Sequence, residues 1–560
     1  MTNTVSEPRA LGENTLRIIP LGGLGDIGRN MTSFELDGQL LLIDCGVLFP
    51  DEDQPGVDLI LPALHLIEHR LDDVLALLVT HGHEDHIGAI PYLLRRRPDL
   101  PVYASQLTLA LIQSKLNEHQ LSKSQLHVVK EGDSVTLGGF QASFLAVNHS
   151  IPDALAIHLR TKAGTVLHTG DFKMDQLPLD HRITDLRGFA RIGEEGLDLF
   201  MCDSTNAETP GFTALEKDLV PALERVFVTA KQRLIVACFA SHVHRVQQIL
   251  RLAHQYGRKA VYVGRSMQRN MHIARELGYL EVPDDILVDL KNIDDYPLDK
   301  LVFISTGSQG EPLSALSRIA NLEHPIIEAG EGDVVLLASS LIPGNENSVY
   351  RVINRLVKNG ATVVHRANAM VHVSGHASAG ELLYCYNILK PRNALPVHGE
   401  ARHLRANADL AIATGVPPER ALVAEDGMVI DLKDGVAAIV GQLDAGYIFV
   451  DGASIGDVSE EELTERKILG EEGLVSIVAV VNLRRRAVQG EPYIHAKGFA
   501  EHESVFDDIR QPLIDVLNRG LADGVNDTYE LQQLVRRTIG TWLNKQLHRR
   551  PMILPTVIAA

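Results

Sequence analysis

Cysteine is scarce in this sequence: there are four residues among 560, none in a Cys-x-x-Cys pair and none with the spacing of a disulfide framework. Long hydrophobic runs are also missing, because no apolar stretch approaches the roughly 18–20 residues that a membrane span needs. The first fifteen residues are polar and contain no apolar segment typical of a secretory signal. These absences predict a protein of the reducing cytoplasm that makes no membrane contact.

Positive charge is in deficit. The chain carries 53 Lys and Arg against 72 Asp and Glu, which gives a formal net charge of −19. The overall field repels phosphate, so a nucleic acid would have to meet a local positive groove or a metal centre. The hydrophobic fraction of 45% is too high for a disordered chain. At roughly 100–200 residues per domain, the length predicts three or four domains.

A glycine-rich turn follows the first predicted strand, at residues 15–20. Gly23, Gly25 and Gly28 fit the Gly-x-Gly-x-x-Gly pattern of dinucleotide-binding folds, which requires a helix directly after the glycines. Residues 31–36 and 39–44 instead read as two strands joined by a turn at Asp37-Gly38. A nucleotide site of that type is therefore disfavoured.

The strongest chemical signal is His81-x-His83-x-Asp85-His86, directly after a buried strand predicted at 74–80. Imidazole nitrogens and carboxylate oxygens are the ligands that divalent metals take in proteins. His81 and His83 alternate and can reach one ion, whereas Asp85 and His86 begin the next turn and can reach a second. We expect Gly82 to let the backbone turn tightly between them.

Later strand ends supply further ligand types. His149 follows a strand predicted within 139–148, Asp171 follows one at 165–169, and His398 follows Leu395-Pro396-Val397. Each alone would more often be a surface or core residue, but together with the first motif they form an ordered set. Asp171 suits a bridging position, because one carboxylate offers two oxygens.

From about residue 213 the chain alternates strands and helices, with strands expected at 233–240, 259–263, 301–306, 334–339 and 362–365. This rhythm predicts a parallel α/β sheet as a separate domain. Because metal-type residues return after it, we interpret it as an insertion. An acidic, small-residue stretch at 446–465 is expected to be a linker. Residues 466–560 are expected to form a small α+β domain with helices at 505–520 and 529–547.

These residues resemble a known family. The ligand set, together with Asp44 in Leu42-Ile43-Asp44-Cys45-Gly46, resembles the metallo-β-lactamase fold, and the insertion with Asp203, His376 and His398 resembles its nucleic-acid-processing β-CASP branch. More narrowly, 22–31, 81–88, 306–312 and 372–376 are similar to bacterial ribonuclease J. The resemblance implies an α/β protein with an αββα metallo-β-lactamase sandwich (1–212 and 366–445), an inserted β-CASP parallel α/β domain (213–365) and the C-terminal α+β domain.

The resemblance also implies roles for individual residues. His81, His83, His149 and Asp171 would hold one metal ion, and Asp85, His86, Asp171 and His398 the other, with Asp85 counted as catalytic as well. The two ions would activate a water molecule and polarise the scissile phosphate. Asp44 would orient the metal loop without binding metal. His376, paired with Asp203, would donate a proton to the leaving 3′ oxygen or hydrogen-bond the phosphate. Some relatives carry Glu where Asp203 stands.

Phosphate-binding residues are expected where strands meet helices. By resemblance, Ser241, His242, His372 and Ser374, together with His376, would hold RNA phosphates, including a 5′-terminal monophosphate. The implied function is a two-metal ribonuclease that acts as a 5′→3′ exonuclease and an endonuclease in RNA maturation and decay. Zn²⁺ suits the histidines, and Mn²⁺ or Mg²⁺ suits the carboxylates. A homodimer or homotetramer and RNA-decay protein partners are also implied.

Two alternatives stay open on the sequence. A small-molecule hydrolase of the same fold, such as a thioester or lactone hydrolase, would need neither the insertion nor the Ser374-Gly375-His376 motif. A non-catalytic RNA-binding scaffold would not need the full ligand set. The sequence therefore favours the nuclease over both.

Overall fold

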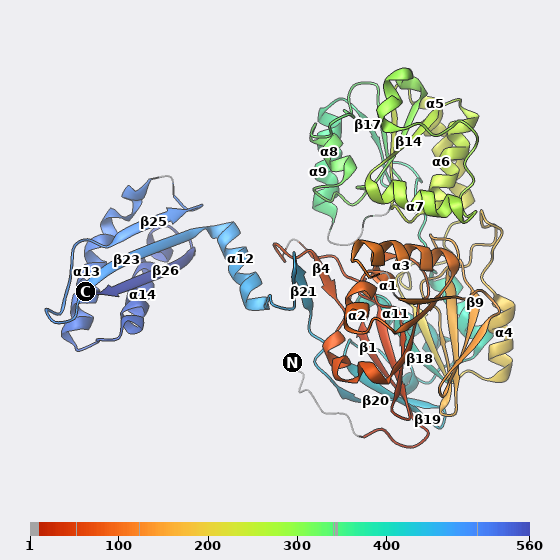
Figure 1. Cartoon of the computed structure of the whole chain (residues 1–560), viewed down its shortest axis with the longest axis horizontal. Coiled ribbons are helices and arrows are strands. Elements are labelled where there is room, and N and C mark those ends of the chain that lie inside the picture. The colour runs from red at the N-terminus through yellow and green to blue at the C-terminus, as the bar shows by residue number, and fades with distance from the viewer. Residues whose placement is uncertain (1–9, 52, 122–123, 340, 342–344, 501) are drawn as a thin grey trace. The chain divides into compact units, whose positions relative to one another are not determined.

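The structure is a computed structural model that describes residues 10–51, 53–121, 124–339, 341, 345–500 and 502–560. It divides into two compact units: residues up to Phe49 together with Leu59–Ile448, and Pro50–Asp58 together with Phe449–Ala560. The first unit contains two packed sheets and a third, inserted sheet, whose elements are labelled in Figure 1.

The first packed sheet has eight strands in the order β20–β19–β1–β2–β3–β5–β6–β7. Neighbouring strands are antiparallel from β20 to β3 and parallel from β3 to β7. The bounds are β1 (Leu16–Gly22), β2 (Met31–Leu36), β3 (Gln39–Ile43), β5 (Val74–Leu78), β6 (Pro101–Ala104), β7 (Gln125–Val128), β19 (Met428–Lys433) and β20 (Val436–Gln442). The glycine turn leads into strand β2 and not into a helix, which confirms that it is no dinucleotide fingerprint.

The second sheet has six strands in the order β18–β12–β11–β10–β9–β8. The bounds are β8 (Ser134–Leu137), β9 (Phe140–Ala146), β10 (Leu155–Thr161), β11 (Gly164–His168), β12 (Leu199–Asp203) and β18 (Asn393–Val397). Apolar side chains of both sheets, among them Phe34, Leu78 and Phe144, form one buried core between them. Because successive strand residues point to opposite faces, the other face of each sheet needs a cover of its own.

Helices provide that cover. On the second sheet, α4 (Leu186–Glu195), α10 (Ala379–Leu389) and α11 (Ala401–Ala413) pack through Phe189, Leu382 and Ala408 into a core that includes Phe200. Near the first sheet lie α1 (Glu84–Ile87), α2 (Ile90–Arg96) and α3 (Gln106–Glu118), and α3 contacts β6 and β7. These layers make an αββα sandwich, which confirms the fold expected from the sequence.

The inserted domain is an all-parallel sheet in the order β14–β15–β13–β16–β17. Its strands are β13 (Leu234–Ala237), β14 (Lys259–Val263), β15 (Leu301–Ser305), β16 (Val334–Leu337) and β17 (Thr362–Val364). Its helices are α5 (Val220–Thr229), α6 (Val243–Gln255), α7 (Arg265–Glu276), α8 (Ala315–Ala320) and α9 (Glu346–Lys358). The strand–helix alternation read from the sequence is confirmed.

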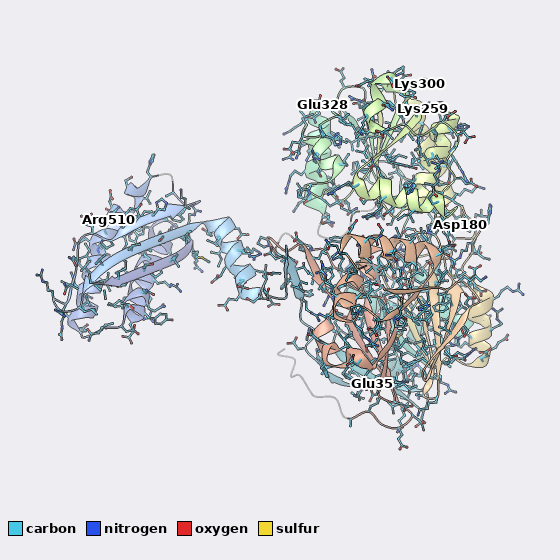
Figure 2. The ribbon with its side chains drawn as sticks, in the orientation of Figure 1. Glu35, Asp180, Lys259, Lys300, Glu328 and Arg510 are labelled. Atoms are coloured by element: carbon cyan, nitrogen blue, oxygen red, sulfur yellow. The ribbon has the colours of Figure 1, made fainter. Side chains whose placement is uncertain are left out.

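Polar contacts join the insertion to the sandwich. His244 of α6 lies 3.2 Å from Asp180, whose side chain is labelled in Figure 2. The Tyr279 hydroxyl donates a hydrogen bond to Asp153 across 2.7 Å, and Arg269 pairs with Glu118 of α3. These three contacts between the insertion and the sandwich are all polar.

The second unit contains β23 (Leu474–Asn482), which pairs with β24 (Ala487–Val488), β25 (Tyr493–Lys497) and, in parallel, β26 (Met552–Ala559). Helices α13 (Asp507–Ala522) and α14 (Thr528–Gln546) share a buried core with this sheet. The segment expected as a linker, 446–465, contains β21 (Ile448–Asp451), β22 (Ser454–Ile455) and the start of α12 (Glu460–Glu472). Three of its acidic residues, Glu460, Glu461 and Glu462, lie in the first turn of α12, where the helix dipole stabilises negative charge. None of the described helices combines the length and apolar composition needed to cross a bilayer.

Candidate functional site

The His81–His86 motif lies where β5 ends and α1 begins. His83 is the N-cap residue of α1, and His86 is buried in its last turn. Gly82, between the two histidines, does not have a positive φ. A Cβ atom there would lie 2.7 Å from the Leu111 side chain, so Gly82 lets the motif pack closely against α3.

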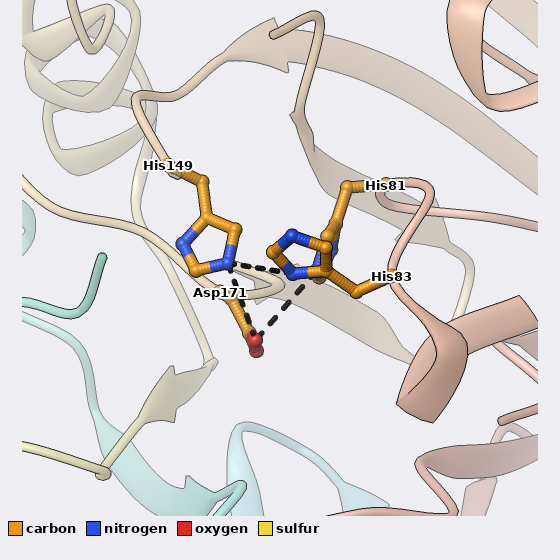
Figure 3. Close-up of side chains that lie close together, drawn as sticks. All are labelled: His81, His83, His149 and Asp171. Carbon is orange, nitrogen blue, oxygen red and sulfur yellow. Dashed lines mark hydrogen bonds and ion pairs between the residues drawn. The ribbon is translucent and has the colours of Figure 1, made fainter. Parts of the chain in front are cut away.

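The first ligand group joins three histidines to Asp171, as Figure 3 shows. His83 Nδ1 lies 3.1 Å from His81 Nε2 and 3.0 Å from His149 Nε2. The Asp171 Oδ2 atom lies 3.7 Å from His81 Nε2 and 3.8 Å from His149 Nε2. Four ligand atoms that converge at these separations are spaced as they would be around one small cation.

The second ligand group also contains Asp171, together with Asp85, His86 and His398. His86 Nε2 lies 3.2 Å from Asp171 Oδ2, and His398 Nε2 lies 3.2 Å from Asp85 Oδ2 and 3.6 Å from Asp171 Oδ2. Asp171 comes three residues after the end of β11, and His398 comes directly after β18. The ends of two strands of the second sheet therefore meet the loop that follows β5 of the first sheet. One carboxylate thus belongs to both groups.

The charges of these groups fit divalent cations. Burial lowers the pKa of His81, His83 and His149, which keeps their imidazoles in the neutral, metal-binding form. Burial acts in the same direction on His398, but the Asp171 carboxylate and hydrogen bonds to Asp203 and Asp85 outweigh it and raise its pKa to about 10. The nearby carboxylates favour a proton on the His398 ring, and a bound metal ion would take the place of that positive charge.

A buried carboxylate oxygen without a partner also indicates a metal site. The Asp171 Oδ1 atom is buried and has no hydrogen-bond partner within the described residues. Burying a carboxylate oxygen without a partner is costly, so such an atom normally has one. The residues present therefore fit one or two divalent metal ions.

Asp44 lies just behind the second group. Its Oδ2 atom accepts a hydrogen bond from His86 Nδ1 across 2.8 Å, and its Oδ1 atom accepts one from the Thr80 backbone N–H, also across 2.8 Å. This contact leaves His86 Nε2 facing Asp171, because the other ring nitrogen is already bonded. Asp44 itself is in none of the ligand groups.

His376 and Asp203 form a hydrogen-bonded pair beside the two ligand groups. His376 Nδ1 lies 2.8 Å from Asp203 Oδ2, and the His376 ring stacks on His398 with 5.4 Å between ring centroids. Burial would lower the pKa of His376, but the charge of Asp203 and its hydrogen bond outweigh burial and raise it. Asp203, His376, His398 and Asp171 also form a third group of ligand-type atoms.

The expected phosphate-binding residues lie at the junction with the insertion. Ser241 is half-buried just before α6. His242 is buried, with its ring 6.3 Å from that of His372 and its Nε2 atom 3.5 Å from Glu216. The Ser374 hydroxyl accepts a hydrogen bond from the His376 backbone N–H across 3.2 Å. The structure thus brings His242 near His372, and Ser374 near His376.

Sequence reasoning missed several residues of the site. Thr205 donates from its hydroxyl to Asp203 and lies 2.7 Å from His398 Nδ1. Behind His242, Glu216 pairs with Arg245 across 3.1 Å and lies 3.7 Å from Lys173, all three buried. The available signal was weak: Thr205 is two positions after Asp203 and Lys173 two after Asp171, but nothing local marks Glu216 or Arg245.

Comparison with known proteins gives consistent matches along the chain. Family models match in four places: the metallo-beta-lactamase superfamily at 24–189, the ribonuclease J beta-CASP domain at 231–356, the Zn-dependent metallo-hydrolase RNA specificity domain at 360–420, and the ribonuclease J C-terminal domain at 461–560. These models together cover most of the chain, including both the sandwich and the insertion.

Curated relatives match over the whole length. Ribonuclease J of Mycolicibacterium smegmatis is 52% identical, with all of both chains covered. Ribonuclease J of Thermus thermophilus is 40% identical over 98% of this chain and 96% of that protein. A crystal structure of a protein of unknown function from Enterococcus faecalis covers 69% of this chain and 94% of its own, with a TM-score of 0.50 and 16% identity, and supports the fold alone.

Proposed function

The chain belongs to the ribonuclease J family and is a metal-dependent ribonuclease, and from this premise we propose the finer activity. We propose that it hydrolyses single-stranded RNA with two divalent metal ions, as a 5′→3′ exonuclease that favours 5′-monophosphate ends and as an endonuclease. The observation that carries this proposal is the pair of ligand groups that share Asp171.

In this proposal one ion is held by His81, His83, His149 and Asp171, and the other by Asp85, His86, Asp171 and His398. Zn²⁺ suits the five histidines, with Mn²⁺ or Mg²⁺ as alternatives for a site that also has two carboxylates. When bound, such ions supply a nucleophilic water at neutral pH and neutralise charge that develops on the phosphate. Asp44 supports the site by fixing the His86 ring.

His376 acts as the proton donor. Hydrolysis breaks the bond between phosphorus and the 3′ oxygen, and that oxygen leaves more easily when it receives a proton. Asp203 accepts a hydrogen bond from His376 Nδ1, which leaves Nε2 as the nitrogen available to the leaving oxygen. The Asp203 charge and its hydrogen bond raise the pKa of His376, which favours the protonated ring that a proton donor requires.

Recognition of the 5′ end is proposed for Ser241, His242, His372 and Ser374. They lie where α6 begins and where the chain returns from the insertion toward His376, so a strand end held there would lie close to the reacting groups. Burial lowers the pKa of His242 to about 4, so its neutral ring would offer a single N–H donor to phosphate.

Assembly is proposed to involve the C-terminal domain. The face of its sheet away from α13 and α14 exposes Tyr493 of β25 and Leu554 and Ile558 of β26. We propose a homodimer or homotetramer that uses this face, with RNA-decay proteins as partners. We also propose a cytoplasmic location and a role in RNA maturation and decay. We further propose domain boundaries at 1–212 with 366–445, 213–365, 446–465 and 466–560.

One experiment tests the activity. The full chain loaded with Mn²⁺ or Zn²⁺ is incubated with single-stranded RNA bearing a 5′-monophosphate, a 5′-triphosphate or a closed circle. We expect mononucleotides from the first, slower release from the second, and internal cuts in the circle. Intact RNA together with cleavage of a thioester would overturn the proposal in favour of a small-molecule hydrolase.

A further inference from the structure

A second cavity lies in the insertion, apart from the metal-type groups. It encloses about 310 Å³ beside α9 and the ends of β15, β16 and β17. This volume is at the lower end of the range typical of small-ligand sites. None of its lining residues belongs to the proposed metal, proton-transfer or 5′-phosphate groups.

The cavity lies at the carboxyl ends of parallel strands. Ser308 follows β15, Ser339 follows β16, and His365 and Arg366 follow β17. In open α/β sheets, ligands bind in the crevice outside these strand ends, because the loops there converge above the sheet. Ser308 of the sequence motif Gly307-Ser308-Gln309-Gly310 thus lines one wall of this crevice.

That wall is held firmly. A Cβ atom at Gly310 would lie 2.6 Å from the backbone of Ser348 in α9, so the loop approaches the helix as closely as a glycine allows. The Gln309 amide donates a hydrogen bond to the Ser339 hydroxyl across 3.3 Å, which ties the loops after β15 and β16 together. Ser308 and Ser339 are both largely buried.

The lining combines an apolar floor with an aromatic and a cationic edge. The floor consists of Leu337, Leu341, Val349 and Ile353. Tyr350 and His365 stand at the rim with their rings almost perpendicular and their centroids 6.4 Å apart. Arg366 is exposed at the same rim and has no ion-pair partner among the residues that the structure describes.

These groups match the parts of a nucleotide. A nucleobase has a flat face that stacks on an aromatic ring, and its ring atoms pack against apolar side chains such as those of the floor. Serine hydroxyls suit the polar edge of a base, and a guanidinium with no carboxylate partner suits a phosphate. We propose that this cavity binds one nucleoside monophosphate unit, with the base against Tyr350 and the phosphate at Arg366.

The nucleotide in this cavity could come from either of two sources. It is either a nucleotide of the RNA strand or a free mononucleotide, the expected product of exonucleolytic digestion, and this second source rests on the proposed function. Arg366 lies near enough to His372 for its positive charge to act on that ring.

Photo-crosslinking tests the site on the metal-loaded full chain. One arm uses 4-thiouridine 5′-monophosphate, and the other uses single-stranded RNA with an internal 4-thiouridine. The position of the crosslinked peptide is the readout, because a nucleotide also contacts the metal centre. We expect the peptide that contains Tyr350 or the one that contains His365 to be labelled, by RNA only for a strand site and by the mononucleotide for a product site.

Variants give the decisive comparison. Arg366→Ala should raise the concentration needed for half-maximal labelling about tenfold, which is the effect of losing a charge-assisted contact. Lys358→Ala, which removes an exposed charge at the far end of α9, should leave labelling unchanged. Active protein with no label at either peptide, or labelling indifferent to Arg366→Ala, would overturn the proposal. If the unsubstituted chain did not hydrolyse RNA, that result would instead count against the proposed function.

Discussion

Substitution of His376 by Gln tests the proton-transfer step most directly. The change removes the only titratable group of that side chain, while Asp203 keeps hydrogen bonds from the Thr205 hydroxyl and backbone N–H. Loss of a positioned general acid typically slows a reaction by about 10²–10⁴-fold, which corresponds to about 3–5 kcal/mol in the activation free energy. We expect kcat to fall by this factor with little change in KM.

A modified substrate isolates the cause. RNA with a bridging 3′ sulfur at the scissile bond has a leaving group that needs no proton, so His376→Gln should slow its cleavage by less than about tenfold. The control is His254→Gln on the exposed side of α6, which should leave both substrates unaffected. Equal slowing of both substrates would refute the proton-donor role.

The metal content of the variant distinguishes a proton donor from a metal ligand at His376. Because His376 also lies in a group with Asp171, Asp203 and His398, it is a potential metal ligand. We expect elemental analysis of His376→Gln to give the same metal content as the unsubstituted chain. A variant that binds one ion fewer would make His376 a ligand and not an acid.

Further predictions concern the shared ligand, the pH dependence of stability and assembly. Asp171→Asn should lower the content of both metals and abolish RNA hydrolysis while circular dichroism stays unchanged; full metal content would contradict a shared ligand. Burial, followed by the charge of Arg160, lowers the pKa of His158 to about 4. The folded protein therefore holds this ring neutral, and the stability that depends on the neutral ring is complete above pH 6.5 and is lost as the pH falls toward 4. Between pH 7 and 5, His158→Phe should therefore lose about 2 kcal/mol less unfolding free energy than the unsubstituted chain, and equal losses in denaturant titrations would contradict this. Leu554→Lys should shift the sedimentation profile toward smaller species, and an unchanged profile would remove this face from the proposed interface.

Local patterns predicted the elements well where hydrophobic periodicity was strong. The helix expected at 529–547 is α14 (Thr528–Gln546), and the hairpin expected at 31–44 is β2 and β3. The acidic stretch at 446–465 was harder to interpret, because charge and small residues suit a linker as well as a helix start. Ser459 and Glu462 form a capping box there, a local signal that begins α12.

The sequence by itself determined the metal-type chemistry, because His81, His83, Asp85 and His86 stand within six positions and any fold after a buried strand keeps them together. It also determined the alternation of strands and helices that marks the insertion, since both periodicities are local. Only the tertiary structure decided which distant residues join them. Asp171 and His398 are more than two hundred positions apart, yet strand pairing brings their side chains within 3.6 Å. The cavity beside Tyr350 and the buried pair of Glu216 and Arg245 likewise depend on packing between elements, and no pattern along the chain records such packing.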